Sequence, residues 1–166
     1  MKRLGIAVTV LALGIAGCGS NNNGNPAGPS NTTVFTVNLL PSNENPPITN
    51  SEQSARGTAV ITVNSQTNTV DINVSLNSFP TGSTLTLAHI HGPNAPVGVN
   101  ASPVVNTGMT AGTAPALVNG AATLTFTGLT ATTADGVAQI LANPQNFYFN
   151  VHSSANPGGV LRGQLR

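Results

Sequence analysis

Charged side chains are scarce in this sequence. Only nine of its 166 residues are Asp, Glu, Lys or Arg, which is 5%, whereas a typical soluble domain has about 25%. A protein that binds nucleic acid through its phosphates needs clustered Lys and Arg, so we predict no nucleic-acid partner. The low charge also argues against a charge-rich disordered tail.

Aromatic residues, cysteine and catalytic motifs are also rare or missing. The chain has no Trp, one Tyr and five Phe, so its core must be mainly aliphatic. Cys18 is the only Cys, so no disulfide can form within the chain. The four acidic residues are widely spread, and the motifs of serine hydrolases, P-loop proteins, zinc peptidases and EF-hands do not occur. These absences favour a non-catalytic protein over an enzyme.

Residues 1–17 have the features of a bacterial secretory signal. Lys2 and Arg3 precede an apolar stretch at 4–15, which is too short to span a bilayer as a permanent helix. The segment ends in Ile-Ala-Gly-Cys and resembles a lipobox, in which Cys18 is lipidated and becomes the first residue of the mature protein. The alternative is an ordinary cleaved signal followed by a chance Cys.

The lipobox resemblance implies where in the cell the protein is located. We expect a lipid anchor at Cys18 to hold the protein to the membrane, in the bacterial cell envelope and outside the cytoplasm. Gly19 stands where an Asp would resemble an inner-membrane retention signal, so we expect the outer membrane if the host has one. Residues 18–33 are rich in Gly, Asn, Pro and Ser without apolar periodicity, and they predict a flexible tether.

From Val34 onward the hydrophobic pattern has the period of two that is typical of β-strands. The clearest run is 70–76, where apolar residues alternate with polar ones. Similar short runs separated by turn residues predict an antiparallel sandwich or barrel. Residues 133–142 break the pattern, since Val137, Ile140 and Leu141 have helical spacing and Pro144 follows. We predict one short helix there.

Three segments carry a resemblance to a known family. They are 39–47 (LLPSNENPP), 88–93 (AHIHGP) and the stretch 147–165, which contains FYFNVHS and NPGGVLRGQL. In this order they resemble the CHRD domain, the module named after chordin, over residues 34–166. The resemblance implies an antiparallel Greek-key β-sandwich, immunoglobulin-like or superoxide-dismutase-like. Asn45 and Val160 depart from the family pattern, where Val and Glu are usual, and Pro41 and Ser42 replace part of the opening turn.

The three histidines are the most suggestive polar residues. His89 and His91 share one face of a regular strand, so both can reach one ion, and His152 from a distant strand could complete a three-histidine site. Imidazole suits copper and zinc among other metals. A His-x-His pair on a sandwich strand is also similar, by analogy, to copper/zinc superoxide dismutase.

A structural role is the alternative for these histidines. Leu85 and Leu87 share the odd positions with His89 and His91, so a continuous strand would point both histidines towards the core. Neutral buried histidines are commonly satisfied by backbone carbonyls. A bulge at residues 92–93 could redirect them.

Glu44 and Arg162 both fall inside the segments that resemble the family. We expect an ion pair between them, or a backbone anchor, rather than a catalytic role. The leading functional hypothesis is a lipid-anchored binding or envelope module without evident catalysis, which contacts an unidentified protein or glycan. The alternative is a protein that binds copper or zinc through His89, His91 and His152, and this could extend to oxidoreductase chemistry.

Overall fold

The structure, a computed structural model, describes residues 31–166 and consists mainly of two antiparallel β-sheets. The predicted signal, the predicted lipidation site at Cys18 and most of the predicted tether lie outside the described residues. The elements are β1 (Thr32–Leu39), β2 (Arg56–Asn64), β3 (Thr69–Asn77), β4 (Leu85–His91), β5 (Pro103–Asn106), β6 (Ala122–Leu129), α1 (Gly136–Ala142), β7 (Tyr148–Ser153) and β8 (Leu161–Gln164).

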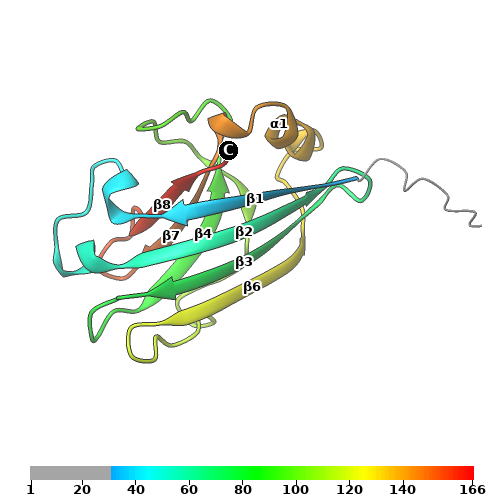
Figure 1. Ribbon diagram of the computed structural model, residues 1–166. Helices are drawn as coiled ribbons and strands as arrows, with labels where there is room; N and C mark the ends of the chain where they lie inside the picture. The colour runs from blue at the N-terminus through cyan, green and yellow to red at the C-terminus, as the bar shows by residue number, and fades with distance from the viewer. Residues whose placement is uncertain (1–30) are drawn as a thin grey trace, which may run out of the picture.

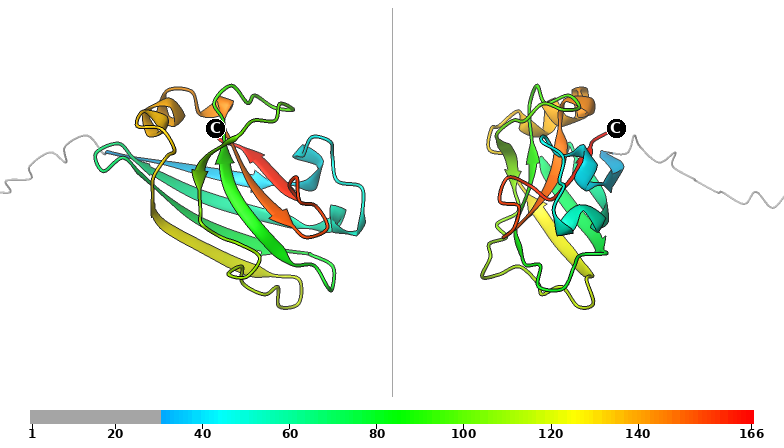
Figure 2. Two further views of the ribbon diagram at one scale, coloured as in Figure 1. Left: turned by 180° about the vertical axis from the view of Figure 1, so that it is seen from behind. Right: turned by 90° about the vertical axis from the view of Figure 1, so that its left-hand side faces the viewer.

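The two sheets pack face to face as a sandwich (Figure 1 and Figure 2). The first sheet has the strand order β1-β2-β3-β6 and the second has the order β5-β4-β7-β8. The chain crosses between sheets after β3, after β5 and after β6, so that β6 returns beside β3 and β7 returns beside β4. These are Greek-key connections. The predicted all-β sandwich with one short helix is therefore confirmed.

The core lies between the sheets and follows from the alternating pattern. On β3 the side chains of Val70, Ile72, Val74 and Leu76 are at most 3% exposed, while the residues between them face outward. Ile72 lies opposite Ile61 of β2. Burial of each such side chain contributes about 1.5–3 kcal/mol relative to leaving it exposed.

The boundaries differ from the sequence pattern at two places. Strand β1 begins at Thr32, two residues before the alternation is visible at Val34. Helix α1 begins at Gly136 rather than 133, because Gly136 N–H donates to the Thr133 carbonyl in a turn that precedes the helix. No helix within residues 31–166 combines the length and the hydropathy that crossing a bilayer would require.

A register shift in β4 sets the direction of the histidines. Leu85 pairs with Ser153 of β7, but Ala88 pairs with Val151, so three steps along β4 match two along β7. The extra residue reverses the alternation, because one residue of slip exchanges the two faces of a strand. Ala88 therefore points into the core, and His89 and His91 point away from it. The expectation that a continuous strand aims both histidines at the core is wrong, and the responsible shift precedes His89 instead of following His91.

Candidate metal centre

The structure brings the three histidines together on the outer face of the second sheet. His89 and His91 come from β4, and His152 comes from β7. These two strands lie side by side in the second sheet (Figure 2). One ring nitrogen from each histidine lies within 4.8 Å of the others. His89 Nδ1 and His152 Nε2 lie 3.2 Å apart.

Two loop carbonyls fix the tautomers of two of these rings. His91 Nδ1 lies 2.8 Å from the carbonyl oxygen of Ala101, and His152 Nδ1 lies 2.8 Å from that of Pro157. A carbonyl only accepts, so each Nδ1 must carry the hydrogen and each Nε2 must present its lone pair. Metal-binding histidines almost always donate their other ring N–H to a carbonyl, carboxylate or water in this way.

The Nε2 atom of His91 has no hydrogen-bond partner although it is buried. A buried acceptor that is left unsatisfied costs about 1–3 kcal/mol. His152 Nε2 faces His89, so His89 must donate its Nδ1 hydrogen to it. The cluster therefore contains one lone pair without any partner and a second that is satisfied only by a neighbouring imidazole.

The environment keeps the imidazoles neutral. Burial, with a smaller effect from the neighbouring His152, lowers the pKa of His89 to about 4. Burial also lowers the pKa of His91 to about 4, and it lowers the pKa of His152. Neutral imidazole is the form that binds metal, so protons do not compete with an ion at neutral pH.

The spacing of the nitrogens suits a transition metal after small side-chain rotations. Bonds of about 2.0–2.1 Å to one tetrahedral or trigonal ion place two nitrogens about 3.3–3.6 Å apart. His89 Nδ1 and His152 Nε2 are already 3.2 Å apart, and one ring nitrogen of each histidine lies within 4.8 Å of the others. His91 and His152 are 7% and 6% exposed, whereas His89 is half-buried, so the approach from solvent is on the side of His89.

Tyr148 and Arg162 form a stack behind His91. The rings of His91 and Tyr148 are parallel to within 3°, with centroids 4.7 Å apart. The guanidinium carbon of Arg162 lies 3.5 Å from the centre of the Tyr148 ring, in a cation–π contact. Tyr148 was not among the predicted site residues, although the alternation of β7 places it on the same face as His152.

Of the two roles expected for Glu44 and Arg162, an ion pair or a backbone anchor, the ion pair does not form and Arg162 is a backbone anchor. Arg162 donates to the carbonyl oxygen of Val99 and to Oδ1 of Asn100, so its role is to anchor this loop. Glu44 accepts a hydrogen bond from Nδ2 of Asn150. Burial, opposed in part by the charge of Arg162, raises the pKa of Glu44 to about 8. The carboxyl group is therefore mostly protonated at neutral pH.

Gly159 makes the contact between Glu44 and Asn150 possible. A Cβ atom at this position would lie 2.6 Å from Oε1 of Glu44 and would also overlap Nδ2 of Asn150. Its φ of +133° is a second reason for glycine, because other residues rarely adopt that conformation. The segment that contains Glu44 therefore packs closely against the turn before β8, and this packing depends on the absence of a side chain at Gly159.

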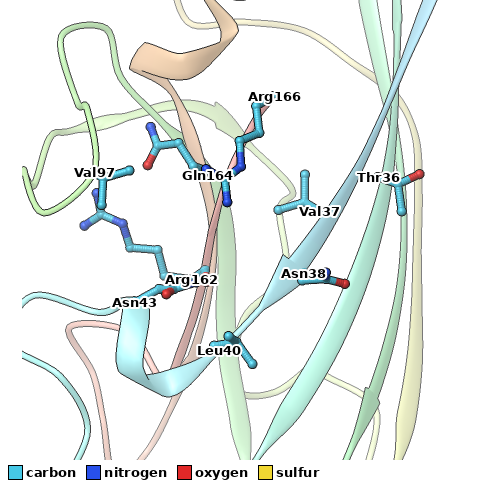
Figure 3. Close-up of a pocket in the computed structure, with 9 residues that line it drawn as sticks. All are labelled: Thr36, Val37, Asn38, Leu40, Asn43, Val97, Arg162, Gln164 and Arg166. Carbon is cyan, nitrogen blue, oxygen red and sulfur yellow. Dashed lines mark hydrogen bonds between the residues drawn. The ribbon is translucent and has the colours of Figure 1, made fainter.

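A cavity of about 320 Å³ lies elsewhere, between β1 and β8 (Figure 3). It is lined by Thr36, Val37, Asn38, Leu40, Asn43, Val97, Arg162, Gln164 and Arg166. None of the histidines reaches it, and the Arg162 guanidinium is already bound to the Val99–Asn100 loop. The lining contains no acidic side chain, so it offers no acid–base pair.

The fold and the site together define an all-β sandwich that carries a histidine cluster on one outer face. The family model described as CHRD domain matches residues 35–165, and the chain belongs to this family. The family suggests an extracellular module of the binding type. Searches of curated proteins and of solved structures found no match to the chain.

Proposed function

We propose that this protein is a membrane-tethered, extracytoplasmic binding module that holds one transition metal ion, copper or zinc, between His89, His91 and His152. The observation that carries the metal site is the buried Nε2 atom of His91, whose lone pair has no partner and belongs to a group of three convergent imidazoles. The family supports the more general statement, a binding module.

A purely structural role explains this arrangement less well. Hydrogen bonds to Ala101 and Pro157 satisfy one nitrogen of His91 and one of His152. A structural histidine would gain from a donor at its second nitrogen, and His91 has none. An ion at this point would satisfy the lone pairs of all three rings at once, which is the usual arrangement of a histidine metal site.

The site supports binding rather than catalysis. Among the described residues, the group that could hold an ion consists of histidines alone, with no carboxylate or thiol within it. A hydrolytic zinc site needs a general base beside the metal-bound water. Glu44, the acid in the neighbouring loop, is protonated at neutral pH and is hydrogen-bonded to Asn150.

Tethering to the membrane rests on the sequence. The leader at 1–17 and the lipobox-like residues that end at Cys18 support export and lipidation, and the polar stretch at 18–33 supports a flexible connection. Such a connection would present the sandwich away from the membrane surface without fixing its orientation.

Metal analysis of the purified full-length protein tests the proposed site. The protein, loaded with zinc or copper and then dialysed, should retain one ion per chain, and the variants His91→Ala and His152→Ala should retain none. The matched control is Asn106→Ala, an exposed residue of β5 that pairs with His89 in the sheet. Loss of the metal from the unmodified protein, or equal retention by His91→Ala, would reject the site.

A further inference from the structure

The charges around the histidine cluster indicate which ion it favours. We propose that the three-histidine site selects monovalent copper, Cu(I), over divalent ions such as Zn(II) and Cu(II), because the site supplies no negative charge and a buried guanidinium lies behind it. This inference rests on the proposed metal-binding function and deepens it.

The ligands themselves are uncharged. Three imidazoles converge, and no Asp, Glu or Cys within the described residues joins the group. A bound ion would therefore keep its full charge in a largely buried place, where uncompensated charge is costly. That cost rises with the charge of the ion, so a monovalent ion is penalised less than a divalent one.

Arg162 adds a fixed positive charge close to the site. Tyr148 separates its guanidinium from His91, and the two contact distances place the guanidinium carbon within about 8 Å of the His91 ring centre. Arg162 is 1% exposed and remains protonated at all ordinary pH values. Its hydrogen bonds end on neutral acceptors, the carbonyl of Val99 and the amide oxygen of Asn100.

The buried acids do not cancel this charge. Glu44 receives a hydrogen bond from Asn150, which lies opposite both His89 and Arg162 in the sheet, and burial keeps its carboxyl group protonated at neutral pH. Glu52 accepts hydrogen bonds from Ser153 and Asn156 and is not part of the histidine group. Arg162 is among the charges that act on His91, whereas Glu52 is not among those that act on any of the three histidines. The three imidazole ligands are therefore neutral, and the charged group near them is the positive guanidinium of Arg162.

The two features act in the same direction. At a separation of about 8–10 Å, with the effective dielectric constant usual for protein sites, each further unit of charge on the ion weakens binding about 15- to 30-fold through Arg162 alone. Cu(I) is the monovalent member of the metals that imidazole binds well. A zinc ion is divalent, and in a three-histidine site it also needs a fourth ligand such as water.

Competition under reducing, oxygen-free conditions tests this inference. The full-length protein would be loaded with Zn(II) and titrated with Cu(I), which a colorimetric Cu(I) chelator buffers. We expect Cu(I) to displace Zn(II) at equimolar concentration. Arg162→Gln should reduce the ratio of Cu(I) affinity to Zn(II) affinity about 15- to 30-fold. Arg162→Lys, which keeps the charge, should retain most of the ratio.

Arg56→Gln is the matched control, because Arg56 begins β2 in the other sheet and hydrogen-bonds only to nearby backbone carbonyls. If Arg162→Gln fails to fold, two measurements on the unmodified protein still test the inference. They are the ratio of Cu(I) affinity to Zn(II) affinity and the reduction potential of bound copper. This potential should be higher than that of aqueous copper. Tighter binding of Zn(II) or Cu(II) than of Cu(I) would overturn the inference and leave the proposed function intact. Failure to bind any of these ions would overturn both.

Discussion

The Nδ1 atom of His89 lies 3.2 Å from the Nε2 atom of His152, although 63 residues separate them in the chain. The carbonyl of Pro157 holds the hydrogen of His152 on Nδ1, so the hydrogen between the two rings belongs to His89. If an ion bound to Nδ1 of His89, the hydrogen of this ring would move to Nε2. His89 is the only half-buried histidine of the three, and the other two are buried. The hydrogen bond between His89 and His152 therefore lies at the position that an ion would take.

Metal binding should stabilise the fold. The ligands come from two strands, and an ion that binds only the folded state adds about 2.7 kcal/mol when its concentration is a hundred times the dissociation constant. Thermal unfolding with and without Zn(II) should therefore show a higher Tm with the ion. His152→Ala should abolish the rise and Asn106→Ala should preserve it. A rise that persists in His152→Ala would place the binding site elsewhere.

The metal-free protein should lose stability in mild acid. The pKa values of His89 and His91 are lowered from 6.5 to about 4 in the folded state. The stabilisation from these neutral rings is complete above pH 6.5 and is lost as the pH falls towards 4. After allowance for the partial exposure of His89, we expect a loss of about 2 kcal/mol in the free energy of unfolding. Urea titrations from pH 7 to pH 4 measure it.

The double variant His89→Gln/His91→Gln provides the comparison for that titration. It lacks the two groups that must become charged, so its stability should fall less over the same range. A fall of equal size in both proteins would mean that other groups cause the acid sensitivity.

Glu44→Gln should stabilise the protein at alkaline pH. A glutamine keeps an oxygen that accepts the hydrogen bond from Asn150 but cannot ionise. Because the folded pKa of Glu44 is about 8, its protonated form is favoured in the fold, and stability is lost as the pH rises from 4.5 through 8. We expect the variant to equal the original protein near pH 4 and to exceed it by about 2 kcal/mol at pH 9.

Asp135→Asn is the control for this measurement. Asp135 is exposed, and hydrogen bonds from Gln139 and Thr133 lower its pKa, so it stays ionised between pH 5 and pH 9. Its substitution should not change the slope of stability with pH in that range. If Glu44→Gln also leaves the slope unchanged, the buried carboxyl group is not the titrating group.

Gly159→Ala should damage the fold while Gly158→Ala should not. A Cβ at Gly159 would overlap Glu44 and Asn150 and would occupy a positive φ, whereas a Cβ at Gly158 meets nothing within 4 Å. Overlap with two buried polar groups and an unfavourable φ should cost about 2–4 kcal/mol. Chemical denaturation of both variants measures the difference, and equal stability would contradict the fitted contact.

Lipidation at Cys18 predicts a simple labelling result. Cells that express the protein and receive a labelled fatty acid should incorporate label into the original protein and into Ser20→Ala. Cys18→Ser should remain unlabelled and leave the membrane fraction. Label in Cys18→Ser would show that another residue carries the lipid, and an unlabelled original protein would rule out the anchor.

The fold could be predicted from the sequence because most of the core depends on a local pattern. The alternation at 70–76 is enough to place Ile72 and Val74 inside, and the structure confirms this. The direction of His89 could not be obtained in the same way. It depends on how β4 pairs with β7, and the extra residue between Leu85 and Ala88 is a property of that pairing.

The site was predictable in its residue types but not in its hydrogen bonds. The spacing of His89 and His91 indicated a shared face, yet nothing in the local sequence indicates that the carbonyls of Ala101 and Pro157 would reach the rings. Those carbonyls lie in loops whose paths depend on tertiary contacts. The expected ion pair of Glu44 with Arg162 failed for a similar reason, since Arg162 instead packs on Tyr148.

The most direct test of the central claim is a crystal structure of the metal-loaded protein with anomalous diffraction recorded at the absorption edge of the metal. We predict one anomalous peak per chain, at about 2.0–2.1 Å from Nδ1 of His89 and from Nε2 of His91 and His152. A loaded crystal in which the peak lies away from these three nitrogens, or in which the rings keep their metal-free contacts, would contradict it.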